Sequence, residues 1–213
     1  FLIVALESQR TQPQVWSDRS SGTGGFAVFA STTHPLYVDL NAKEARRDLG
    51  LDEPPFDRVQ FVPMRLVSGD DASCLNLNRA IQPQITGVDI EALDRRNAFT
   101  FQKTRAPPGA TPWEMLRYQP GANAAPAALD YNTMTYSLKL KLGDTLTYID
   151  DFGEPFTFRI VAALRPGMLQ GMLLADAAAL EARFPASAGF RVFLVDAAKP
   201  TDTAAIDAAA LAT

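Results

Sequence analysis

Cysteine and histidine are almost absent from this 213-residue chain, which contains one of each, Cys74 and His34. A single cysteine excludes a disulfide within the chain and any zinc site built from cysteines. Catalytic triads and Cys–His pairs also draw on these two residue types. We therefore expect a protein that is not an enzyme, with no catalytic residues, no metal site and no bound cofactor.

An excess of basic charge is also missing. The chain has 20 Lys and Arg against 24 Asp and Glu, which gives a net charge of −4. The basic pairs Arg46-Arg47 and Arg95-Arg96 have acidic neighbours and are interpreted as parts of a solvated surface. Because a nucleic-acid-binding protein needs a basic face, no nucleic acid partner is expected. The 47% of hydrophobic residues is enough to build a core.

Long hydrophobic runs are lacking too, since nothing within the chain approaches the roughly 20 apolar residues of a membrane-spanning helix. The chain begins with the short apolar run FLIVAL and ends with an alanine-rich stretch at 204–213. Residues 1–10 are either a first strand or the last turns of a membrane helix. We expect the chain to be one extracytoplasmic domain, 1–213, cut from a larger membrane protein.

The order of strand and helix patterns predicts an α+β fold with mixed or antiparallel sheets and short helices, because the two kinds of element interleave without a regular repeat. Residues 11–25 are expected to form a flexible loop, since SSGTGG lacks the lysine of a phosphate-binding loop. Asn41, Asp89 and Asp176 are expected to begin helices. The predicted strands are 25–31, 59–67, 85–88, 145–149, 155–164 and 189–195, and the predicted helices are 42–49, 89–97, 112–118 and 177–184, with a last helix opening at 200.

Two features within this pattern are more specific. Residues 145–149 and 155–164 flank a Gly-bearing turn and predict a hairpin, with Phe156, Phe158, Ile160 and Ala162 on one face of its second strand. Residues 104–127 carry five prolines and are the best place for an internal seam. They are not expected to be a free linker, because Trp113 within them needs something to pack on.

One candidate for chemistry is the stretch SGDDASC at 68–74, where Asp70 and Asp71 precede Ser73 and Cys74. A metal site or an activated nucleophile is the functional interpretation. However, two adjacent acids do not supply converging oxygens, and no cationic neighbour lowers the pKa of the thiol. A turn after a strand is the favoured interpretation.

Other candidates are equally isolated. Asp150 and Asp151 are possible paired carboxylates, but adjacent acids in a hairpin turn are expected to face water. His34 is a possible base without a nucleophile motif, and we expect it on the surface. Gly167 and Gly171 form either a ligand rim or, as we expect, two bends around a strand. None of these residues is predicted to form an active site.

The last third of the chain contains the run LGDTLT at 142–147, then Gly153, then FTFRIVAAL at 156–164. These runs resemble the Leu-Gly-Asp step and the closing strand found in FtsX-like ABC transporter permeases. Most members have glycine where this chain has Ala162 or Ala163. Further similar runs are DYNT at 130–133, LQG at 169–171, FP at 184–185, GFRVFLV at 189–195 and, upstream, GDDASCLNL at 69–77.

The resemblance implies a MacB-like periplasmic domain with two intertwined subdomains, on the periplasmic side of the bacterial inner membrane. In this family a cytoplasmic ATPase drives the permease, and the periplasmic domain transmits the motion to a partner outside. The implied roles are efflux, lipoprotein release or control of cell-wall hydrolases. The implied partners are an ABC ATPase subunit, a periplasmic protein or lipid-like substrate, and a second permease in a homo- or heterodimer.

Two other function classes stay open. The first is an extracytoplasmic module that binds a small molecule or peptide, with an aromatic-lined groove around Trp113 and Tyr118. The second is a hydrolase that uses Asp70, Asp71 or His34, which the composition disfavours.

Overall fold

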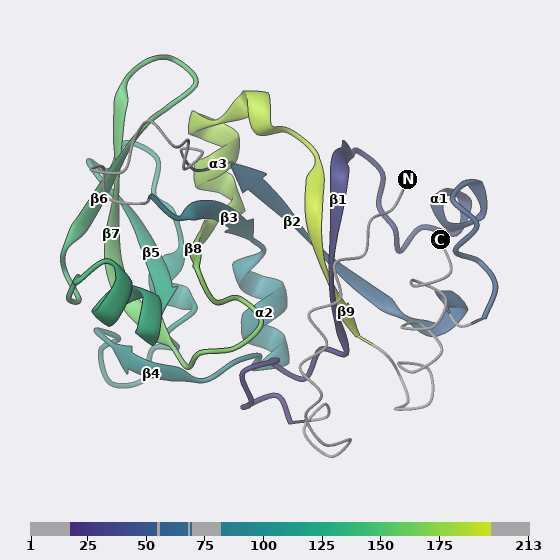
Figure 1. Cartoon of the computed structure of the whole chain (residues 1–213), viewed down its shortest axis with the longest axis horizontal. Helices are drawn as coiled ribbons and strands as arrows, with labels where there is room; N and C mark the ends of the chain where they lie inside the picture. The colour runs from purple at the N-terminus through teal and green to yellow at the C-terminus, as the bar shows by residue number, and fades with distance from the viewer. Residues whose placement is uncertain (1–17, 55, 68, 70–81, 197–213) are drawn as a thin grey trace.

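The computed structural model describes residues 18–54, 56–67, 69 and 82–196, and these residues form one mixed nine-stranded sheet with short helices on both faces (Figure 1). This architecture confirms the α+β expectation. The strands are β1 (Val28–Leu36), β2 (Gln60–Val67), β3 (Gln84–Val88), β4 (Phe101–Thr104), β5 (Ala125–Asp130), β6 (Thr145–Ile149), β7 (Pro155–Leu164), β8 (Met172–Asp176) and β9 (Phe190–Asp196).

The helical elements are short. They are α1 (Lys43–Asp48), α2 (Ile90–Arg96), α3 (Ala177–Arg183), the 3₁₀ turns η1 (Phe56–Arg58), η2 (Glu114–Leu116) and η4 (Pro185–Ser187), and the π-helical turn η3 (Thr133–Ser137). The strand order is β1-β9-β2-β3-β8-β5-β7-β4, and β6 pairs with β7 beside this path. Only β3 with β8 and β5 with β7 pair in parallel.

Strand β2 divides the sheet into two lobes. Its first half pairs with β9, from Gln60 to Met64, and its second half pairs with β3, from Arg65 to Val67. We call β1, α1, β9 and the first half of β2 the small lobe. The large lobe comprises residues 65–67, 69 and 82–188. The small lobe thus contains the first and last strands of the described chain, and the large lobe is inserted between β2 and β9.

Three apolar cores lie on the two faces of the sheet. Along β9, Val192 and Leu194 belong to the first core, whereas Phe193 and Val195 belong to the third. Since successive strand residues point to opposite faces, these cores lie on opposite sides. The second core, under α3, likewise lies opposite the first, because Leu173 and Leu174 of β8 are divided between them. The first core joins both lobes, and the other two each belong to one lobe.

The predicted hairpin of β6 and β7 is confirmed, but one of its side chains lies on the unexpected face. The pairing of β5 with β7 shifts register at Val161, which is an extra residue in β7. This bulge places Ala162 in the first core, whereas Phe156, Phe158 and Ile160 lie in the second.

The sequence did not predict β5, which lies in the middle of the sheet between β8 and β7. Its residues, APAALD, are poor strand formers, and Pro126 cannot donate a backbone hydrogen bond. The segment before it is well packed, as expected from its aromatic content. Trp113 is buried, and its indole N–H donates to the carbonyl of Ala98 at 3.0 Å. The helix predicted at 112–118 is reduced to the short turn η2.

The described part of the expected flexible loop, residues 18–25, is instead held against the large lobe. The amide of Phe99 donates to the carbonyl of Arg19 at 2.8 Å, and the amide of Met168 donates to the carbonyl of Gly22 at 3.0 Å. At its start, the hydroxyl and amide of Ser20 bond to the carboxylate of Asp18 and hold the pKa of that carboxyl below its usual value.

The arginine pairs are also not simply solvated. Arg46 is buried, and its guanidinium donates to the carbonyls of Leu40 and Val59 at 2.7 and 2.6 Å. Arg96 is half-buried, forms an ion pair with Asp196, and lies 4.3 Å from the ring centre of Phe26. Arg96 therefore connects the end of α2 to the end of β9.

A substitution at Gly167 tests how closely residues 18–25 pack against the large lobe. A Cβ atom at this position would lie 1.9 Å from the carbonyl oxygen of Gly22. We expect Gly167→Ala to lower the free energy of unfolding by about 3 kcal/mol, measured by urea denaturation. Gly121→Ala is the control, because it meets open space and has only the cost of a left-handed φ of 85°, about 1 kcal/mol. Equal losses in the two variants would contradict this packing.

Candidate functional site

A groove of about 620 Å³ crosses β2 between the two lobes. Its floor is formed by β2, and its walls come from the starts of α2 and α3, from β9 and from the segment before α1. The residues lining it include Asn41, Phe61, Val62, Pro63, Arg65, Gly87, Glu91, Arg117, Glu181 and Phe190. It is therefore the best candidate for a binding site in the described part of the chain.

The groove exists because two neighbouring parallel strands end together. Val88 of β3 is paired with Asp176 of β8, and each strand leads directly into a helix. Helix α2 packs in the first core and α3 in the second, so the two helices leave on opposite faces. Connections that diverge in this way open a crevice at the carboxyl ends of the strands.

Both helices begin where the sequence predicted. The carboxylate of Asp89 accepts from the amide of Ala92 at 2.9 Å, and that of Asp176 accepts from the amide of Ala178 at 3.0 Å. The other oxygen of Asp176 accepts from the amide of Tyr118 at 2.9 Å. These carboxylates are thus engaged in fixing the rim of the groove.

Beyond the end of β3, the edge of β2 has no strand partner on its groove side. The side-chain amide of Asn41 takes that place: it donates to the carbonyl of Phe61 and accepts from the amide of Phe61, both at 2.9 Å. Two residues on, the edge carries Pro63, which has no N–H to leave unpaired. Asn41 is therefore not the helix cap that was predicted, and α1 has no side-chain cap.

The charged side chains of the groove are already paired. Arg65 donates to Glu181 at 2.9 Å and lies 5.7 Å from the ring centre of Phe190. Arg117 donates to Glu91 at 3.2 Å. With paired charges on the walls and apolar residues on the floor, the groove suits a ligand with apolar groups and an amide-like polar backbone.

The candidate catalytic residues are not brought together. Asp70, Asp71, Ser73 and Cys74 lie outside the described residues. His34 is exposed on β1, as expected, and its carbonyl accepts from the hydroxyl of Thr32 at 2.7 Å. Within the described ranges, no three His, Cys, Asp or Glu side chains gather as a metal site would require.

The expectation that Asp150 and Asp151 both face water was wrong for Asp150. Its side chain is buried, where one carboxylate oxygen accepts from the amides of Phe152 and Glu154 at 3.0 and 2.9 Å. Asp151 is exposed but accepts from the amide of Ala186 at 2.6 Å. Both acids fix the β6–β7 turn, which the pattern of adjacent acids did not indicate.

The two glycines lie in bends, as expected, but no strand lies between them, because residues 168–170 form a turn and β8 begins only at Met172. The backbone of Gly167 lies against that of Gly22. Gly171 has a φ of 81° and donates its amide to Asp130 at 2.9 Å. Neither glycine is among the residues that line the groove.

The predicted aromatic groove around Trp113 and Tyr118 was also wrong. Trp113 fills the first core, where its ring lies 5.0 Å from that of Phe101. Tyr118 packs edge-on against Phe156, with 6.2 Å between ring centres. The groove over β2 was missed, and its only signal in the sequence was Pro63, which marks an unpaired strand edge.

No protein-family model matches the sequence, and no curated protein matches it. None of the helices in the described part is long and apolar enough to cross a membrane.

Removing the amide of Asn41 tests how the open edge of β2 is protected. Asn41→Ala leaves the N–H and C=O of Phe61 without partners, so we expect the free energy of unfolding to fall by about 1–2 kcal/mol in urea denaturation. Asn123→Ala is the matched control, because Asn123 is exposed and should change stability by less than about 0.5 kcal/mol. If both variants unfold like the wild type, the Asn41–Phe61 contact does not protect the edge.

Proposed function

We propose that this chain is an extracytoplasmic domain of an FtsX-like ABC transporter permease on the periplasmic side of the bacterial inner membrane. The observation that carries the proposal is the pairing of β1 with β9. The amide of Ala27 donates to the carbonyl of Val195 at 2.9 Å, so the strands by which the chain enters and leaves the domain lie side by side (Figure 1). A domain inserted between two membrane helices needs this arrangement.

The local structure of the family-like run supports the resemblance. Gly143 has a φ of 101°, which favours glycine, and its amide donates to the carbonyl of Ile160 at 2.7 Å. The amide of Ile160 donates to the backbone carbonyl of Asp144 at 2.9 Å, and the carboxylate of Asp144 accepts from the backbone amide of Lys141 at 2.8 Å. The Leu-Gly-Asp step thus fixes the start of β6 against β7, which gives its glycine and aspartate a structural reason.

The division into two lobes supports the finer part of the proposal, a MacB-like domain with two intertwined subdomains. The small lobe is built from the first and last strands of the described chain, and β2 belongs to both lobes. In this proposal the two lobes are the two subdomains.

A mechanical and non-catalytic role fits this packing. The first core contains residues of both lobes, such as Leu93 of α2 and Leu194 of β9. Because close-packed interiors transmit strain, the lobes should move as one body. The β6–β7 turn lies far along the molecule from β1 and β9 (Figure 1). Movement produced by a cytoplasmic ABC ATPase would thereby reach a periplasmic protein or lipid-like substrate.

The topology of the full-length protein tests this proposal. In a Cys74→Ser background, Tyr136→Cys places a thiol at a site that is strongly exposed. We expect a membrane-impermeant maleimide to label it in intact spheroplasts. Val88→Cys is the control, because that position is fully buried and should react only after denaturation. Labelling of Tyr136→Cys only after lysis would place the domain on the cytoplasmic side and refute the proposal.

A periplasmic binding module is the second candidate function, and the groove over β2 is the observation that favours it. We expect short synthetic peptides to raise the Tm of the wild type and to raise that of Arg117→Ala less, since Arg117 lines the groove. Arg58→Ala is the control, because Arg58 forms an exposed ion pair with Asp57 outside the groove. A shift that is absent, or equal in all three proteins, would count against binding in the groove.

A further inference from the structure

The turn between β6 and β7 presents two large apolar side chains to solvent. Ile149 is 66% exposed and Phe152 is 64% exposed, although they are only three residues apart. Large apolar side chains close together on a protruding turn are a common sign of an interaction site. The turn projects from the large lobe, away from β1 and β9 (Figure 1).

This turn is fixed by a buried charge. The carboxylate of Asp150 is 5% exposed, accepts from the amides of Phe152 and Glu154, and lies 3.2 Å from the guanidinium of Arg183. A buried carboxylate is stable only when it is paired and hydrogen-bonded. The two amide bonds hold the backbone of the turn, the contact with Arg183 balances the buried charge, and the side chain of Phe152 stays exposed.

The turn is also anchored to the end of α3. The amide of Asp151 donates to the carbonyl of Arg183 at 3.1 Å, and its carboxylate accepts from the amide of Ala186 at 2.6 Å. The guanidinium of Arg183 also lies 4.7 Å from the ring centre of Phe156, which follows the turn near the start of β7. The tip is therefore preorganised, so a partner would not need to order it on binding.

We infer that Ile149 and Phe152 dock into an apolar pocket of a protein partner, and that this pocket is edged by Lys or Arg. Aromatic side chains carry much of the binding energy at protein interfaces. The charge of Asp150 is balanced by Arg183, but Asp151 and Glu154 remain as exposed carboxylates beside the tip. A cationic rim complements these carboxylates, whereas an anionic membrane surface repels them.

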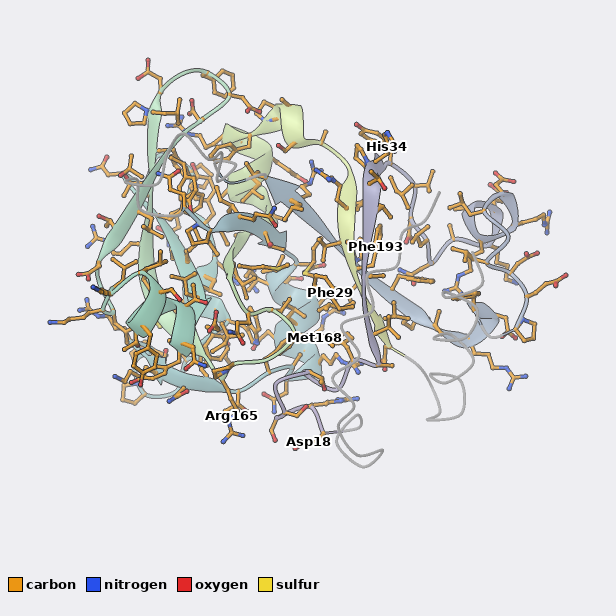
Figure 2. The ribbon with its side chains drawn as sticks, viewed as in Figure 1. Asp18, Phe29, His34, Arg165, Met168 and Phe193 are labelled. Atoms are coloured by element: carbon orange, nitrogen blue, oxygen red, sulfur yellow. The ribbon has the colours of Figure 1, made fainter. Side chains whose placement is uncertain are left out.

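This inference goes beyond the proposed function and stands on the geometry of the hairpin alone. A cytoplasmic location in the maleimide experiment would leave it intact, and failure of docking would leave the permease proposal intact. His34 of β1 and Phe193 of β9, both labelled in Figure 2, lie well apart from the β6–β7 turn.

In vivo photocrosslinking of the full-length protein in its own host cells tests the inference. Benzoylphenylalanine replaces Phe152 in one variant and Tyr136 in the control, since Tyr136 is 69% exposed on η3. We expect a crosslink from position 152 to one discrete protein, with little or none from position 136. The crosslinked peptide should contain apolar residues with Lys or Arg beside them.

A charge change makes the test specific. Glu154→Lys should reduce the crosslink from position 152 at least fivefold, because the cationic rim would then face a cation. The thermal midpoint of unfolding should stay unchanged, since Glu154 is exposed and its side chain forms no hydrogen bond or ion pair among the described residues. A crosslink to lipid, equal yields at positions 152 and 136, no crosslink, or a yield insensitive to Glu154→Lys would each overturn the inference.

Discussion

The double pairing of β2 is the constraint on which the rest of the structure depends. Because its first half bonds to β9 and its second half to β3, the strand joins the paired first and last strands to the inserted lobe. The same division leaves one edge of β2 open where β3 stops. Asn41 and Pro63 protect that edge, and the groove follows its course. The lobes, the adjacent ends and the groove therefore have a common origin.

Arginines reinforce this junction by using backbone carbonyls as well as acids. Arg46 joins the segment before α1 to the residue that precedes β2, and its guanidinium lies 5.5 Å from the ring centre of Phe61. Arg96 joins α2 of the large lobe to Asp196 and to the carbonyl of Gly25. A planar guanidinium with five donors can bond several carbonyls at once, which an ammonium group cannot do as well.

The features that the sequence predicted depend on neighbouring residues. The β6–β7 hairpin follows from alternation around a turn, and the caps Asp89 and Asp176 act within three residues. The features it missed depend on distant segments: β5 is a strand because β7 and β8 flank it, and its small alanines fit between two cores. The groove was missed for the same reason, since Asn41 reaches Phe61 only once β2 has paired with β9. The buried role of Asp150 needed Arg183 of α3 beside it.

The two faces of the sheet should differ in how they carry force. On one face the first core runs through both lobes without a break, whereas on the other the second and third cores are separate. The groove lies along β2, whose residues Phe61 and Val67 belong to these two different cores. Bending between the lobes would therefore change the groove most and the first core least, because a close-packed core resists deformation. A ligand in the groove would contact both lobes without entering the first core, so binding there and mechanical transmission through that core are compatible uses of one fold.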